Sequence, residues 1–286
     1  MIDFHVHPVQ VAELTDLDPE LEHAVRDVFG LYVKPQPIAT LLGQMEEAGI
    51  DQAVILPLDC STEHKCTVIS NEQVAWLCER YEQLVGFASV DPRDPSAPER
   101  LEHAVRQQGL RGLKLDPALQ RFDLDSREHA FPVYERAAEL QIPVLIHCGM
   151  SFAPRGRSSA AHPLALEEVA AELPSLRIVI AHFGWPWVTE ALMLALKFPN
   201  VSLDTSVLYS GTPADSIRHV MSDLIGLEVI DRSLSNQVVF GSNYPRVDPK
   251  RMVAGIRSLD LPAALERNIF HENAARLLAG PGGGAR

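Results

Sequence analysis

The chain has 286 residues, 46% of them hydrophobic, and a formal net charge of −13. This length and hydrophobicity suffice for one domain with a deep core, and they exclude extended disorder outside the terminal residues 280–286. The acidic balance argues against nucleic acid or an anionic membrane as a partner, although a locally positive site can still bind a small anionic substrate. No apolar run reaches the length of a membrane span and no leader peptide is apparent, so we expect a cytoplasmic protein.

Short apolar or β-branched segments alternate with helical segments along the chain. The predicted strands are Ile2–Val6, Gln52–Leu56, Leu84–Val90, Leu110–Leu115, Pro143–His147, Arg177–His182, Val201–Asp204 and Gln237–Phe240. The predicted helices are Ile38–Ala48, Asn71–Tyr81, Ala97–Gln108, Phe131–Leu140, Pro163–Leu173, Trp187–Phe198, Pro213–Leu224, Pro249–Ser258 and Glu272–Leu278. Several strands are apolar at successive positions, which is typical of parallel strands covered on both faces.

This alternation predicts right-handed βαβ units and a parallel sheet. Eight such units favour an α/β fold of the closed (β/α)₈ TIM-barrel type with C-terminal helices, as one domain over residues 1–279 with a flexible tail over 280–286. An open doubly wound sheet is the alternative, but no GxGxxG follows the first strand. The long irregular stretch between Pro8 and Pro37, with a helical patch near Leu21–Phe29, would lie over the active face of a barrel as a lid.

The first predicted strand carries Asp3-x-His5-x-His7. Because side chains alternate along a strand, His5 and His7 project from the same face, which in a barrel is the interior. Asp3 is expected on that face one layer deeper, where it either orients His5 or pairs with buried backbone. A His-x-His pair in a strand also arises by chance, so these residues alone do not establish a metal site.

Two further histidines end apolar strands. His147 follows Pro143-Val144-Leu145-Ile146, and His182 follows Ile178-Val179-Ile180-Ala181. Active sites of α/β barrels are built from the carboxyl ends of the strands, so four histidines at the ends of strands one, five and six predict a shared site. Neutral imidazole nitrogen suits borderline metals, and the four residues together predict a bound divalent metal.

The order of these motifs resembles the amidohydrolase superfamily, specifically the amidohydrolase-related group that includes α-amino-β-carboxymuconate-semialdehyde decarboxylase and γ-resorcylate decarboxylase. The resemblance spans the whole chain and rests on Asp3-Phe4-His5-Val6-His7, Gly112-Leu113-Lys114-Leu115, Ile146-His147-Cys148-Gly149, Ala181-His182-Phe183-Gly184, Phe240-Gly241-Ser242-Asn243-Tyr244-Pro245 and Asn273-Ala274-Ala275-Arg276-Leu277. It implies a barrel with one catalytic divalent metal, for which zinc is the expected ion. It also implies that His5, His7 and His147 are metal ligands and that His182 is the catalytic histidine of strand six.

The end of strand eight departs from the family pattern. The family usually has Gly-Ser-Asp-x-Pro there, and this chain has Gly241-Ser242-Asn243-Tyr244-Pro245. The family aspartate is a metal ligand and, in hydrolytic members, the base that takes the proton of water. Asn243 could still offer its amide oxygen to the metal, but it cannot accept a proton as a carboxylate does. Three explanations stay open: a natural variant that uses His182 as the base, a non-hydrolytic enzyme, or an engineered substitution that traps a complex.

Four basic residues fall on the predicted active face of this acidic chain. Lys114 follows the apolar run of strand four, Arg155 and Arg157 lie in the loop after strand five, and Arg246 follows strand eight. We predict that they bind a substrate carboxylate, which arginine holds in a bidentate mode; solvated loop arginines are the alternative. For Lys114 two other roles stay open, an ion pair with Asp116 and the carboxylated lysine of two-metal relatives.

Asp204 ends strand seven and is either the N-cap of the following segment or a partner that orients a ligand.

Two classes of function remain. The first is a metal-dependent enzyme for a small cyclic or aromatic substrate that bears a carboxylate, acting by hydrolysis of an amide, ester or lactone, or alternatively as a non-oxidative decarboxylase. The second is a catalytically weak barrel that binds a small acid, which only Asn243 favours. A homo-oligomer is compatible with either class.

Overall fold

A computed structural model describes residues 1–18, 20–206 and 211–279 of the chain. The predicted tail over residues 280–286 lies outside the described residues. No helix of the described residues has both the length and the apolar character needed to cross a membrane.

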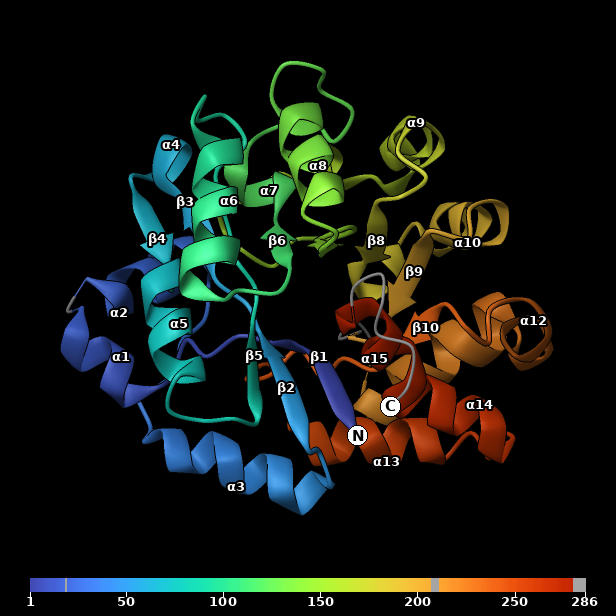
Figure 1. Ribbon diagram of the computed structural model, residues 1–286. Helices are drawn as coiled ribbons and strands as arrows, with labels where there is room; N and C mark the ends of the chain where they lie inside the picture. The colour runs from blue at the N-terminus through green and yellow to red at the C-terminus, as the bar shows by residue number, and fades with distance from the viewer. Residues whose placement is uncertain (19, 207–210, 280–286) are drawn as a thin grey trace.

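Eight parallel strands form the centre of the fold and helices surround them (Figure 1). The strands are β1 Ile2–Val6, β2 Gln52–Ile55, β5 Leu84–Gly86, β6 Leu113–Leu115, β7 Pro143–Ile146, β8 Arg177–Ile180, β9 Val201–Asp204 and β10 Val238–Val239. They pair in the orders β1-β2-β5 and β10-β9-β8-β7-β6. All eight predicted strands are present, and six are shorter than predicted because their apolar ends continue as single bridges and turns rather than as regular ladders.

Backbone hydrogen bonds join the two sheets on both sides. The amide of Phe4 donates to the carbonyl of Phe240 at 2.8 Å, which connects β1 to the end of β10. The amide of Lys114 donates to the carbonyl of Ala88 at 2.7 Å, which connects β6 to the segment after β5. The strands therefore form the predicted (β/α)₈ barrel rather than an open doubly wound sheet.

Two apolar cores follow from this arrangement. The barrel interior is filled by alternate residues of the strands, namely Ile2, Phe4, Val54, Leu56, Val85, Phe87, Leu145, Val179 and Val239. Ala274, Leu277 and Leu278 of the C-terminal helix α15 (Asn273–Leu278) join this cluster, so α15 closes one end of the barrel. A larger core lies between the strands and the surrounding helices. The end of the barrel opposite α15 is left to polar side chains.

The predicted helices are present with small shifts at their ends. They are α3 Ile38–Ala48, α5 Asn71–Cys78, α6 Ala97–Gln108, α8 Ala130–Glu139, α9 Leu166–Glu172, α10 Val188–Lys197, α11 Pro213–Ile217 with its continuation η5 Arg218–Ile225, α13 Pro249–Arg257 and α15. Gly49 and Gly109 end α3 and α6 with φ angles of 74° and 71°, a left-handed conformation that glycine adopts without a Cβ clash.

Several short elements were not predicted. They are the antiparallel pair β3 Leu58–Cys60 and β4 Cys66–Val68 with α4 Ser61–His64 between them, α7 Pro117–Gln120, α12 Leu227–Ser233, α14 Ala263–Arg267, and the η2 (Ser158–Ala161), η3 (Pro163–Ala165), η4 (Ala181–Gly184) and η6 (Asn268–Glu272) turns. Most span three to five residues, which is too short to show a hydrophobic period.

The stretch between Pro8 and Pro37 is more ordered than predicted. It contains α1 Ala12–Leu17, α2 Leu21–His23 and η1 Ala24–Val28, so the predicted helical patch is present. Leu14, Val25 and Val28 are buried against the rest of the molecule. This stretch is therefore packed rather than irregular, and the ring centroid of Phe29 within it lies 4.9 Å from that of His7.

Candidate metal centre and active site

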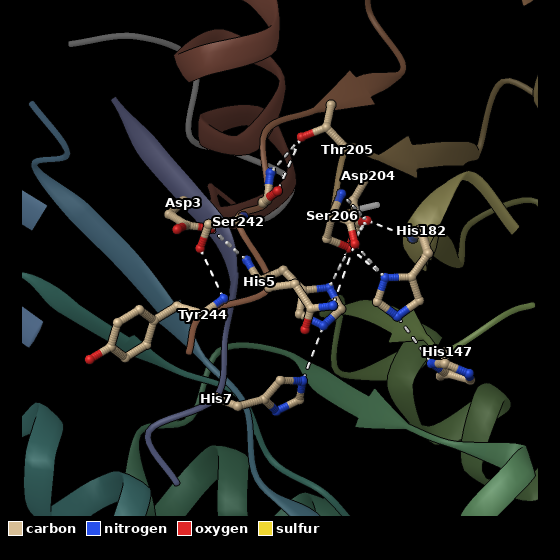
Figure 2. Close-up of polar contacts among 12 residues, drawn as sticks. Asp3, His5, His7, His147, His182, Asp204, Thr205, Ser206, Ser242 and Tyr244 are labelled. Carbon is tan, nitrogen blue, oxygen red and sulfur yellow. Dashed lines mark hydrogen bonds and ion pairs between the residues drawn. The ribbon is translucent and has the colours of Figure 1, made fainter. Parts of the chain in front are cut away.

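Four histidines meet at the polar end of the barrel (Figure 2). His5 lies in β1, His7 follows β1, His147 follows β7, and His182 lies in the turn η4 after β8. None of the four is more than 8% exposed. Burial disfavours the imidazolium form, and desolvation is the main cause that lowers the pKa of each ring. All four rings are therefore neutral at pH 7.

His5 and His7 face each other through their Nε2 atoms, which lie 3.1 Å apart. The Nδ1 atom of His5 is 2.7 Å from a carboxylate oxygen of Asp204, so the ring proton sits on Nδ1. Two nitrogens that bind one tetrahedral zinc ion at 2.0–2.1 Å lie about 3.3 Å apart. The spacing of the two Nε2 atoms therefore fits a shared divalent metal.

His147 and His182 form a second pair. The Nδ1 of His147 lies 3.1 Å from the Nε2 of His182, and the Nε2 of His147 is buried with no hydrogen-bond partner among the described residues. Burial lowers the pKa of His147 to about 3. A buried, unpaired imidazole nitrogen is costly unless a cation or a ligand satisfies it. His147 therefore also has an atom available to a metal.

The expected ligands do not all meet in one tight cluster. Among the described residues, the side chains with metal-binding atoms within 4.8 Å of one another are His5, His182 and Asp204. The structure thus pairs two predicted ligands, His5 and His7, and places the third, His147, against His182. His182, which we predicted only as the catalytic histidine, lies closer to the other imidazoles than expected.

Asp204 and Ser206 connect the histidine pairs. One oxygen of Asp204 contacts His5, and the other accepts hydrogen bonds from the backbone amides of His182 at 2.7 Å and Ser206 at 3.0 Å. The Nδ1 of His182 donates toward the carbonyl of Ser206 at 2.9 Å and lies 2.8 Å from its hydroxyl. Both contacts foreseen for Asp204 are present, one with a predicted ligand, His5, and one with the backbone of the segment that follows. Ser206 was missed because a lone serine after a strand carries no sequence signal.

Asp3 does not lie where the alternation predicted. Ile2 and Phe4 fill the barrel interior, and the register of β1 on β2 shifts between Asp3 and Val6. This irregularity turns His5 toward the interior and leaves Asp3 on the other face. There its carboxylate accepts hydrogen bonds from the amides of His5 and Ser242, and burial raises its pKa to about 7. Asp3 therefore pairs with buried backbone.

Asn243 lies at the same end of the barrel and lines the same cavity as His7, His147 and His182. Its backbone amide donates to the carbonyl of His5 at 2.9 Å, and its φ angle is 62°. The side-chain amide nitrogen donates to the carbonyl of Ser206 at 3.4 Å. That contact leaves the amide oxygen as the atom of Asn243 able to face a cation.

Two glycines of the motifs allow the strands to approach this closely. A Cβ on Gly149, after His147, would lie 2.0 Å from the carbonyl oxygen of Trp185, and its φ is +105°. A Cβ on Gly241 would lie 2.8 Å from the Cβ of His5. Any larger residue at these two positions would push the turn after β7, or the end of β10, away from the histidines.

The cavity beside the histidines is lined with charge. Lys114 and Asp116, from β6 and the residue after it, and Arg246 line it together with Phe29 and Phe152. Lys114 is 2% exposed, and its ammonium makes no hydrogen bond or ion pair with the described residues, so the suggested ion pair with Asp116 is not formed. Burial lowers the pKa of Lys114, while Asp116 and Asp204 act in the opposite direction.

The predicted arginines separate into two groups. Arg246 is half-buried, donates to the carbonyl of Phe29 at 3.0 Å and lines the cavity. Arg155 and Arg157 are exposed and lie outside the cavity lining. All three arginines lie in loops that follow barrel strands. That position alone therefore did not identify which of them reaches the cavity.

A comparison with models of protein families identifies the family of this chain. A model of that family, described as amidohydrolase, matches residues 2–279. A 2-keto-4-carboxy-3-hexenedioate hydratase of a Sphingobium species is 25% identical over 255 residues, which cover 78% of this chain and 71% of the hydratase.

Solved structures share the fold at lower identity. An uncharacterised TIM-barrel protein of Bordetella bronchiseptica superposes with a TM-score of 0.75 at 22% identity, covering 98% of each chain. A putative 2-pyrone-4,6-dicarboxylic acid hydrolase of Pseudomonas putida has a TM-score of 0.67 at 20% identity and 97% coverage of each chain. A 5-carboxyvanillate decarboxylase variant of Novosphingobium aromaticivorans, with bound manganese, has a TM-score of 0.63 at 17% identity, covering 97% of this chain and 96% of its own.

Proposed function

Because this chain belongs to the amidohydrolase family, we propose that it is a metal-dependent enzyme that adds water to a small carboxylate substrate in the cavity beside the four histidines. The observation that carries this proposal is Lys114, a residue 2% exposed whose ammonium has no hydrogen-bond or ion-pair partner among the described residues and which lines the same cavity as His147 and His182. An unpaired charge in a buried position costs free energy, so an anionic group of the substrate is the partner we assign to it.

Arg246 provides a second positive charge at the cavity. Its guanidinium is held by the carbonyl of Phe29 and packs over the Phe29 ring at 5.1 Å. A planar guanidinium suits a carboxylate or a carbonyl oxygen of the substrate. Phe29 and Phe152 provide the apolar surface for a flat ring or a conjugated chain. The exposed Arg155 and Arg157 are left out of this proposal.

We assign the metal to His5 and His7, with His147 as the third protein ligand and the amide oxygen of Asn243 beside it. A divalent metal held there supplies Lewis acidity toward water or a substrate oxygen. Imidazole-rich ligation suits zinc, but the similar decarboxylase contains manganese, so both ions belong in the test.

His182 is the residue that we assign as the base. Its Nδ1 proton is directed at Ser206, which leaves the lone pair of Nε2 on the side of His147, whose Nδ1 lies 3.1 Å away. Burial keeps the ring neutral, and a neutral imidazole can take the proton that water loses when it attacks the substrate. The side-chain amide of Asn243 cannot accept this proton, so in this proposal His182 takes the role of base that the family aspartate usually has.

Hydrolysis and hydration both fit this arrangement. Similarity to a hydratase of an unsaturated keto acid and to a pyrone dicarboxylic acid hydrolase supports water addition to a carboxylate-bearing substrate in either form.

Decarboxylation is a second candidate, and Asn243 is the observation that favours it. Loss of carbon dioxide requires an electron sink and a proton donor for the carbanion carbon, and it does not require a base for water. Burial raises the pKa of Asp116, which lines the cavity, and this direction favours Asp116 as the candidate for that donor. The similar manganese-containing decarboxylase supports this candidate.

One experiment separates the candidates. The protein, loaded with zinc or manganese, is incubated in ¹⁸O-labelled water with a panel of lactones, unsaturated keto acids and aromatic carboxylic acids. Incorporation of ¹⁸O into a product without release of carbon dioxide supports water addition, whereas stoichiometric carbon dioxide supports decarboxylation. Lys114→Met and Lys114→Arg are compared, since only the arginine variant retains the charge. Turnover that is unchanged in Lys114→Met would remove the observation on which the proposal depends.

A further inference from the structure

We propose that Asp204 is a positioning residue that holds His5 and His182 in one fixed arrangement, so that a metal ligand and the base are placed by the same carboxylate (Figure 2). This inference deepens the proposed function and rests on it for the roles of the two histidines. The contacts themselves do not depend on those roles.

The first contact fixes the tautomer of His5. One oxygen of Asp204 lies 2.7 Å from the Nδ1 atom of His5, and neither side chain is exposed. A carboxylate only accepts hydrogen bonds, so Nδ1 must carry the ring proton. The lone pair of His5 is then on Nε2, which faces the Nε2 of His7.

The second contact fixes the backbone that carries His182. The other oxygen of Asp204 accepts the backbone amide of His182 at 2.7 Å, the amide of Ser206 at 3.0 Å and the hydroxyl of Ser206. His182 has φ 60° and ψ 26°, a left-handed conformation that non-glycine residues adopt only when their surroundings hold it. Asp204 therefore stabilises the turn that directs His182 into the site.

Both contacts require two acceptor oxygens. An asparagine offers one oxygen and one NH₂ group. If the oxygen of Asp204→Asn remains on the amides of His182 and Ser206, its NH₂ faces Nδ1 of His5, and the ring proton must move to Nε2. If the oxygen turns to His5 instead, the NH₂ faces the amide of His182 and that hydrogen bond is lost. Either outcome disturbs one of the two histidines.

Direct binding of a metal by Asp204 is the competing role, because its oxygens lie within 4.8 Å of nitrogens of His5 and His182. In that case the metal replaces the proton between Asp204 and His5. The two roles therefore differ in the state of a single atom, Nδ1 of His5.

The experiment reads that atom by long-range ¹H–¹⁵N NMR of the protein labelled with ¹⁵N-histidine, metal-free and then titrated with zinc. The His5 signals are assigned by their loss in His5→Gln. Asp204→Asn is compared with Thr205→Val, a matched control that also removes buried hydrogen bonds at the end of β9, those of the Thr205 hydroxyl with Gly241.

We expect wild-type His5 to carry its proton on Nδ1 both before and after zinc is added. In Asp204→Asn we expect the proton to move to Nε2, or the amide resonance of His182 to shift, and zinc affinity to fall about 10–100-fold. Thr205→Val should keep the wild-type tautomer and a zinc affinity within about two-fold of wild type. Affinity falls when a ligand histidine loses the carboxylate that accepts its ring proton, and Thr205→Val leaves that carboxylate in place.

Three results would overturn the proposal: an unprotonated Nδ1 of His5 in the metal-free wild type, loss of that proton on zinc binding, or an Asp204→Asn variant with unchanged His5, His182 and zinc affinity. If Asp204→Asn does not fold, the wild-type spectra still decide. Absence of turnover with every substrate of the panel would contradict the proposed function and leave these spectra unaffected.

Discussion

The Nε2 atoms of His5 and His7 lie 3.1 Å apart although both rings are buried and neutral. Two lone pairs directed at each other repel, unless a proton or a cation lies between them. A divalent metal that takes the place between them binds the folded state, and it stabilises that state by an amount that grows with the logarithm of the ratio of free metal to dissociation constant.

We predict that zinc or manganese raises the midpoint of thermal unfolding and that a chelator lowers it. At a free metal concentration of 100 times the dissociation constant, the gain is about 2.7 kcal/mol in the free energy of unfolding. His5→Gln and His7→Gln should abolish most of this gain. His103→Gln, at an exposed position on α6, should retain it. Equal metal-induced shifts in all three variants would place the metal elsewhere.

The buried ammonium of Lys114 should lower the free energy of unfolding of the substrate-free protein. Burial lowers its folded-state pKa below the usual value of 10.5, so unfolding takes up a proton and wild-type stability rises with pH between the lowered pKa and about 10.5. Lys114→Met should therefore be more stable than wild type at pH 7, and the difference should shrink as the pH approaches 10.5. Urea unfolding of both proteins at pH 7 and pH 10 measures this. A variant less stable than wild type at pH 7 would show that the ammonium has a partner.

His182→Ala should reduce turnover by about 10²–10⁴-fold, the usual contribution of a positioned base, while bound metal stays near one equivalent. Because burial holds the pKa of His182 well below 6.5, the ring stays neutral between pH 6 and pH 8, and the wild-type rate should not fall over that range through protonation of His182. Metal content and initial rates across this range check both statements. Loss of metal in His182→Ala would identify His182 as a ligand instead. The two roles need to be separated because His182 lies only 3.1 Å from His147, a proposed ligand.

Asn243→Asp distinguishes the role of His182 from that of the family aspartate. With His182 as the base, the added carboxylate should tighten metal binding and change the rate by less than about ten-fold, because it also lowers the Lewis acidity of the metal. Rates and bound metal are compared with the unmodified sequence. A rate increase of about 10²–10⁴-fold would show that a carboxylate base is missing at this position, as expected for an engineered substitution. No change in either quantity would place Asn243 outside the mechanism.

The sequence by itself determined the barrel and the candidates for its site. Strands that are apolar at successive positions must be buried on both faces of the sheet. Their alternation with helices leaves only a few possible strand topologies. The four histidines and Asn243 were identifiable because they end such strands, where the active sites of this fold are built. These inferences depend on local pattern and on distance along the chain, both of which the sequence contains.

Only the tertiary structure decided how these residues are paired. The register shift in β1 moved Asp3 off the face of His5, which a regular alternation of side chains could not predict. Three findings depend on contacts between segments up to about two hundred positions apart. They are the contacts of Asp204 and Ser206, the lack of a partner for the Lys114 ammonium among the described residues, and the separation of Arg246 from Arg155 and Arg157. Such contacts are set by how strands and loops pack in space, and a single sequence does not state the distances between them.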